Sequence, residues 1–178
     1  MIVSRLGGRR AAIRPEENSA VFAGPHTARR ERPGSGRRGR PARTVLEVRR
    51  SYGGMTMRAL LGGAFVPGAP GTGTVFEVRH GTPWEPGESG TCRSELGTPL
   101  VAGLPSDFAT AVLDALAGTP ADPPLPPGIL RVDRAAFDPL ASSEAAFTLT
   151  AALLRQATDA LARGGDAIAV TRAALNRW

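Results

Sequence analysis

The sequence predicts a small α+β domain, and two observations carry this prediction. Short runs within residues 44–79 alternate apolar and polar side chains with the period of two that is typical of strands, whereas later segments repeat apolar side chains every three or four residues, as helices do. A chain of 178 residues is also close to the usual size of one domain. We therefore expect a single hydrophobic core.

The N-terminal segment, residues 1–43, is expected to be a disordered arm. Residues 1–50 hold 13 Arg against 4 Glu, whereas residues 51–178 hold 9 Arg against 12 acidic residues, so the positive charge is concentrated near the N-terminus. Such a polar segment offers too little apolar surface to offset the lost backbone entropy of about 1–2 kcal/mol per residue. The ordered domain is then expected to span residues 44–165.

Three strands are expected in the first half of that domain, over residues 44–49, 55–66 and 75–79, with Gly62 and Gly63 interrupting the second. Residues 81–100 are rich in Gly, Pro and Ser and predict a long turn-rich connection.

Two helices and one further strand are expected in the second half. Asp107 precedes a helical repeat of apolar residues that Gly118 ends, and an alternating strand follows over residues 129–133. The second helix opens at Ser142 and Ser143 and ends near residue 164. The tail, residues 166–178, is compatible with a third helix or a strand.

The motifs that carry common chemistries are incomplete. Residues 68–74 (GAPGTGT) resemble a phosphate-binding loop, but the motif needs a Lys and the chain has none. The two histidines, His26 and His80, have no companion at metal-ligand spacing, and the single cysteine, Cys92, excludes an intrachain disulfide and a Cys-based zinc site. We expect no catalytic residues, cofactor or metal. Trp84 is expected to anchor its own loop, with stacking on a base as the alternative.

The arginines of the arm are the candidate nucleic-acid contacts, because cations that meet phosphates release counterions and give salt-dependent affinity. A solvated tail is the first alternative, and sequence upstream of a later start codon is the second. All 22 basic residues are Arg, which a GC-rich coding sequence produces without selection for an anionic partner. The predicted contacts are Arg29, Arg30, Arg32, Arg37, Arg38, Arg40 and Arg43.

No stretch of the sequence approaches the roughly 20 apolar residues that span a bilayer, and the first ten residues lack the apolar run of a signal peptide. We expect a cytoplasmic protein with no membrane partner.

Two segments resemble domain IV of translation elongation factor G, the ribosomal translocase. The family has Gly, a residue, Ile or Leu, Pro, a residue, Glu-Tyr, two residues and Ala-Val where a helix begins, and residues 103–112 read GLPSDFATAV. Further along, the family has Asp-Ser-Ser shortly before Ala-Phe at the start of a long helix, and residues 141–147 read ASSEAAF. The resemblance covers about residues 100–157. It implies a two-layer fold with a four-stranded sheet, two helices on one face and a left-handed βαβ crossover.

Two loops depart from the family. Its glycine-rich tip motif has only Ser51-Tyr52-Gly53-Gly54 as a counterpart, and its loop His and Asp correspond to Asp138 and Ala141. The resemblance implies a non-catalytic protein that binds the ribosome or structured RNA. The alternative is a degenerate remnant of a translation factor or a tetracycline-protection GTPase with no retained activity.

Overall fold

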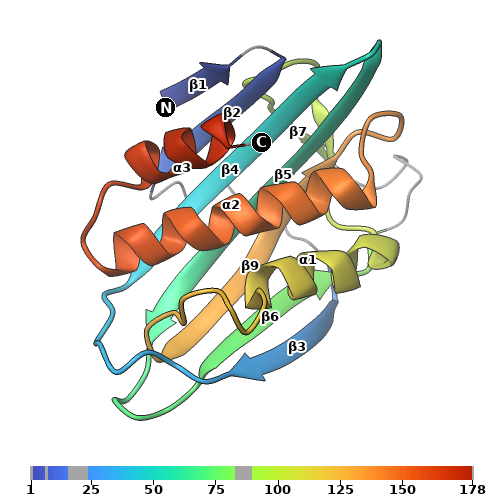
Figure 1. Cartoon of the computed structure of the whole chain (residues 1–178). Helices are drawn as coiled ribbons and strands as arrows, with labels where there is room; N and C mark the ends of the chain where they lie inside the picture. The colour runs from blue at the N-terminus through green and yellow to red at the C-terminus, as the bar shows by residue number, and fades with distance from the viewer. Residues whose placement is uncertain (1, 7, 16–23, 83–89, 178) are drawn as a thin grey trace.

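The computed structural model describes residues 2–6, 8–15, 24–82 and 90–177, which form one mixed sheet with α-helices on one of its faces (Figure 1). The coarse prediction of an α+β fold is confirmed. The helical elements are the 3-10 turn η1 (Ser106–Phe108) and the helices α1 (Ala109–Ala117), α2 (Glu144–Ala162) and α3 (Ala167–Asn176). The strands are β1 (Ile2–Leu6), β2 (Arg9–Pro15), β3 (His26–Arg32), β4 (Ala42–Tyr52), β5 (Met55–Pro67), β6 (Thr74–His80), β7 (Thr91–Cys92), β8 (Leu100–Ala102) and β9 (Gly128–Phe137).

Among the described residues the sheet has the order β1-β2-β4-β5-β9-β6-β3, and the short pair β7 and β8 joins it beside β9. Strands β6 and β9 are parallel neighbours, and the chain between them carries α1. The other strand pairs are antiparallel. A four-stranded sheet with two helices is therefore wrong for this chain, because nine strands and three α-helices are present in the described ranges.

The prediction of a disordered arm is also corrected. The segment 1–43 supplies β1, β2 and β3, and β4 begins at its end. Ile13 lies opposite Leu46 of β4 and is 2% exposed, while β3 pairs with β6 along its whole length. The low apolar content of this segment did not predict disorder correctly, because the strands of the segment are stabilised by pairing with β4 and β6. A strand that joins an existing sheet satisfies its backbone groups against that neighbour and needs few apolar side chains of its own.

The helices begin close to where the sequence places them. Ser143 is the N-cap of α2, and its hydroxyl accepts a hydrogen bond from the backbone N–H of Ala146 at 3.2 Å. The tail is helical, because the carboxylate of Asp166 accepts from the N–H groups of Ile168 and Ala169 and thereby caps α3. None of the helices in the described ranges is long and apolar enough to span a membrane.

The main core lies between the sheet and its helix-bearing face. Phe108 and Phe147 stack there with ring centroids 4.8 Å apart, and Val112 beside them is fully buried, as the periodicity predicts. The opposite face of the sheet is covered in part by the segment that contains β7 and β8, where Leu60, Cys92 and Leu100 form a smaller apolar cluster. The described residues thus form one helical layer on one face of the sheet and a smaller cover on the other, where Val45, Glu47 and Leu60 are also buried.

Candidate nucleic-acid interface

Three of the predicted arginines lie in the segment that connects β3 to β4. Arg37, Arg38 and Arg40 are exposed, and the backbone that carries them is held at both sides. The N–H of Ser35 donates to the carbonyl of Leu125 at 2.7 Å, and the N–H of Arg40 donates to the carbonyl of Ala162 at 2.9 Å. These contacts hold the segment against the rest of the fold and place Arg40 beside the C-terminal end of α2.

Arg32, at the end of β3, points toward the same end of the molecule. Its Nη1 donates to the carbonyl of Gly118 at 3.2 Å, just after α1 ends. Arg163 donates from Nη2 to the carbonyl of Pro124 at 2.8 Å, and from Nε to Asp159 at 2.7 Å. Cations are favoured at these positions because free carbonyl groups gather where helices end.

Arg155 lies near these arginines, on the buried side of α2. Its side chain is 9% exposed, and its Nη2 donates to the carbonyl of Pro123 at 2.5 Å. Burial lowers the pKa of Arg155, while Asp122 and Asp159 act in the opposite direction. The group nevertheless stays charged, since the pKa of arginine starts far above neutral pH. A buried cation of this kind favours any anion that reaches it.

We call these six arginines, which are Arg32, Arg37, Arg38, Arg40, Arg155 and Arg163, the basic end. Two carboxylates lie among them. Asp159 pairs with Arg163, and Asp122 accepts from both the N–H and the hydroxyl of Thr119 at 2.6 and 3.0 Å, contacts that lower its pKa. Among the residues that the structure describes, the six cations of the basic end outnumber these two carboxylates, so the basic end carries an excess of positive charge.

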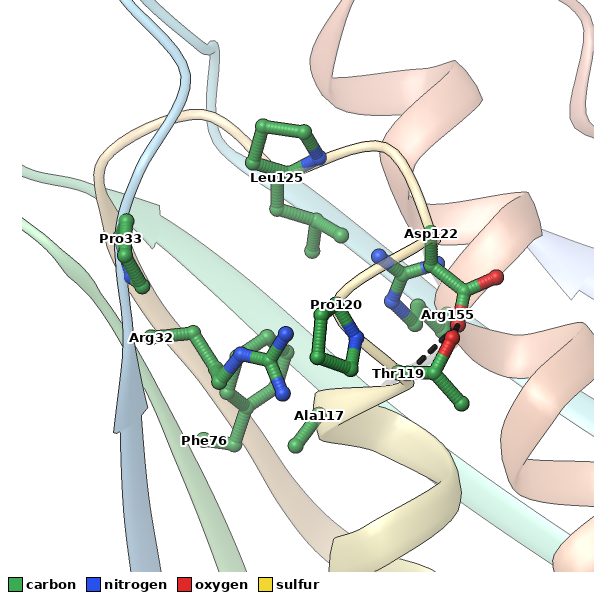
Figure 2. Close-up of a pocket in the computed structure, with 10 residues that line it drawn as sticks. Arg32, Pro33, Phe76, Ala117, Thr119, Pro120, Asp122, Leu125 and Arg155 are labelled. Carbon is green, nitrogen blue, oxygen red and sulfur yellow. Dashed lines mark hydrogen bonds between the residues drawn. The ribbon is translucent and has the colours of Figure 1, made fainter.

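Two cavities open within the basic end. The first has a volume of about 250 Å³ and lies between β3, the loop after α1 and the inner side of α2 (Figure 2). The second, of about 630 Å³, adjoins it and is lined by Arg163 and Arg177 among others. Asp122 and Arg155 line both cavities, so the two are neighbours.

The remaining predicted arginines are not part of this cluster. Arg30 forms an ion pair with Asp114 of α1, and Arg43 pairs with Asp133 at a distance of 2.9 Å between Nη2 and Oδ2. Arg29 lies opposite Glu77 in the register of β3 and β6 and is exposed on the sheet face without helices. Four of the seven predicted contacts thus gather at one end, and three do not.

Sequence reasoning missed Arg155 and Arg163, since they belong to the part of the chain with a negative charge balance. A local signal did exist for Arg155. It follows Leu153 and Leu154 directly, and both leucines are fully buried on α2. A charged residue at a buried helical position needs a partner or a function. The sequence around Arg155 therefore already indicated that this arginine was a candidate functional residue.

The two histidines, which the sequence separates by 54 positions, meet across β3 and β6. His26 lies opposite His80 in register, and their ring centroids are 5.7 Å apart. Burial lowers the pKa of His80, and the nearby His26 lowers it further. No cluster of three or more His, Cys, Asp or Glu side chains with the geometry of a metal site occurs in the described ranges. Trp84 lies outside the described residues.

A buried ion pair lies on the sheet face opposite the helices. Glu47 is fully buried and Arg58 is 3% exposed, with Arg58 Nη2 at 3.3 Å from Glu47 Oε1. Ser94 and the backbone N–H of Glu95 donate to the same carboxylate at 2.6 and 2.8 Å. These contacts fasten the loop after β7 onto the sheet. The hydrogen bonds of this carboxylate are satisfied within the protein, so we assign the pair a structural role.

The turn between β4 and β5 and the loop that precedes α2 lie together at the far end of these two strands. Gly53 and Gly54 form the turn of the β4–β5 hairpin with φ angles of 57° and 81°. The second loop reaches the same hairpin, because Ser142 donates to the carbonyl of Arg58 at 2.6 Å and Arg58 N–H donates to Ala141 at 3.0 Å.

No family model, curated protein or solved structure matches the chain.

Proposed function

We propose that this protein binds the ribosome or another structured RNA through its basic end, without catalysis, and that its domain is of the elongation factor G domain IV type. The observation that carries the proposal is the excess of arginine at one end of the fold. Arg37, Arg38 and Arg40 are exposed there on a segment that hydrogen bonds hold in place. A fixed array of guanidinium groups binds phosphate groups more effectively than a free tail, because less entropy is lost on binding.

Counterion release predicts how this binding depends on salt. Each phosphate that a cation neutralises contributes about −0.9 to the slope of log affinity against log salt on duplex nucleic acid. Contacts from the four exposed or partly exposed arginines Arg32, Arg37, Arg38 and Arg40 then correspond to a slope of about −3 to −4. Affinity for RNA should fall by about two orders of magnitude between about 50 and 200 mM salt.

Three features support a domain of the elongation factor G domain IV type. The parallel pair β6 and β9 is connected through α1, which is a βαβ unit, and its left-handed sense stays a prediction. Residues 103–112 cover the entry to α1, and residues 141–147 cover the entry to α2, where the family has its motifs. The β4–β5 turn and the loop before α2 stand where the family has its two tip loops, although they depart from its motifs. They meet at one end of the sheet, about 33 Å along β4 from the end near Arg40, at the strand rise of about 3.3 Å per residue.

The test is RNA binding by a charge-reversed variant and a matched control. Arg37→Glu/Arg38→Glu changes the charge of the basic end, while Arg10→Glu/Arg93→Glu makes the same change in exposed residues of β2 and of the loop after β7. Co-sedimentation with ribosomes and fluorescence anisotropy with an RNA hairpin measure the affinity of both at low and high salt.

We expect the first variant to lose at least tenfold in affinity, which is 1.4 kcal/mol, and to show a shallower salt slope, with the control close to the parent protein. Equal losses in both variants would mean that only net charge matters and would refute the assignment of the basic end. No binding at low salt would favour a remnant of a translation factor that retains no activity.

A further inference from the structure

The first cavity of the basic end combines flat apolar walls with two cations. Phe76 and Leu125 are almost fully buried and form part of its lining, together with Pro33, Pro120 and Pro124. Arg32 and Arg155 enter it from opposite elements, β3 and α2 (Figure 2). Aromatic, proline and guanidinium surfaces are the groups on which nucleobases stack in RNA-binding proteins.

Arg155 retains hydrogen-bonding capacity in this cavity. Within the described part of the chain only its Nη2 has an acceptor, the carbonyl of Pro123, and its Nε is buried without any partner. Arg32 uses Nη1 for the carbonyl of Gly118. Each guanidinium carries five N–H donors in a planar fork that matches a phosphate group, so both residues keep donors for an anion.

The size of the cavity limits what enters it. A volume of about 250 Å³ corresponds to about eight water molecules at roughly 30 Å³ each. That space holds one base, whereas the usual pockets for drug-sized ligands start at about 300 Å³. Part of the wall is apolar, and the charged residues of the lining are Arg32 and Arg155 with one carboxylate, Asp122, so the cations are in excess. A planar group attached to a phosphate fits this combination.

We propose that this cavity holds a single nucleotide of single-stranded RNA, with the base against Pro33, Pro120 and Pro124 and its phosphate near Arg32 and Arg155. The proposal rests on the proposed function and names the form of RNA that the basic end selects. A base inside a duplex remains stacked and paired and does not reach the cavity. The protein therefore prefers single-stranded RNA, or loops and ends with unstacked bases, over a continuous duplex.

The direct probe is adenosine monophosphate, observed by ¹H–¹⁵N NMR of the full chain. The backbone amide of Thr119, which donates to Asp122, and the Nε–Hε group of Arg155 report on the cavity. Adenosine and inorganic phosphate are titrated in parallel. We expect adenosine monophosphate to shift these signals at lower concentration than either fragment, since it contacts the walls and the cations together.

Arg32→Gln tests whether the charge of Arg32 contributes to nucleotide binding. The substitution carries little risk to folding, because the side chain is partly exposed. Arg30→Gln is its matched control, since Arg30 lies on the same strand two positions away and pairs with Asp114 outside the cavity. We expect Arg32→Gln to weaken binding of adenosine monophosphate about tenfold, as the loss of a charge-assisted hydrogen bond does. The control should bind within twofold of the parent protein.

Three outcomes overturn the proposal. Equal binding of inorganic phosphate and adenosine monophosphate would mean a site for phosphate alone. Binding of the nucleotide without binding of a single-stranded oligonucleotide would mean a small-molecule site. If Arg37→Glu/Arg38→Glu weakens RNA binding but Arg32→Gln leaves single-strand preference unchanged, the proposed function stands and the nucleotide site does not.

Discussion

Replacing Glu47 with Gln should destabilise the fold strongly, because this carboxylate balances a buried arginine. Glu47 is fully buried, and its two oxygens accept from Arg58, from the hydroxyl of Ser94 and from the N–H of Glu95. Glutamine keeps the shape but loses the charge, and its amide NH₂ meets groups that are themselves donors. Arg58 then retains one carboxylate, Asp138, at 3.3 Å.

Removing one partner of a buried ion pair costs about 3–5 kcal/mol, since the remaining charge stays away from water. We expect Glu47→Gln to cost an amount near the lower half of that range, because Asp138 compensates part of the charge of Arg58. The total stability of a domain is about 5–15 kcal/mol, so the loss is a large fraction of it. The loop after β7 should also loosen, because the Ser94 hydroxyl and the N–H of Glu95 donate to different oxygens of Glu47 and glutamine keeps only one acceptor oxygen.

Glu77→Gln is the control. Glu77 pairs with Arg131 at 2.7 Å across β6 and β9, but the Arg131 side chain is 52% exposed. Exposed ion pairs contribute about 0–1 kcal/mol, so we expect a loss below about 1 kcal/mol. Urea unfolding followed by far-ultraviolet circular dichroism measures both variants. Equal losses in the two variants would show that burial of Glu47 is not what makes its charge important, and the reasoning would fail.

Three further predictions concern the histidine pair, the core and the cap of α2. Folding lowers the pKa of His80 below its ordinary 6.5, so the neutral ring favours the folded state. This stabilisation is present above about pH 6.5 and is lost as the pH falls through the folded-state pKa. His80→Gln should therefore flatten the fall in melting temperature between about pH 7 and 5, and an unchanged pH profile would contradict this expectation. Phe147→Ala should cost about 3–5 kcal/mol in urea unfolding, because the ring is fully buried against Phe108. Ser143→Ala should cost about 1 kcal/mol through the lost N-cap, and a loss below about 0.3 kcal/mol would mean that the cap contributes nothing.

The sequence alone determined the elements whose signals are local. Ser143 caps α2 and Phe147 fills the core, because a cap and a helical repeat depend on residues three or four positions apart. The strands near residues 44–49, 75–79 and 129–133 follow from alternation in the same way. The sequence also predicted four of the six arginines of the basic end as nucleic-acid contacts.

The tertiary structure decided what the Arg-rich segment becomes and where its charges meet. Strands β2 and β3 form because β4 and β6 offer backbone partners, and no pattern within residues 1–43 shows that these partners are available. Arg32 and Arg155, which are 123 positions apart, line one cavity because β3 and α2 pack into the same fold. The pairing of distant segments depends on the free energy of the whole domain, so charge counts along the chain did not predict the candidate site.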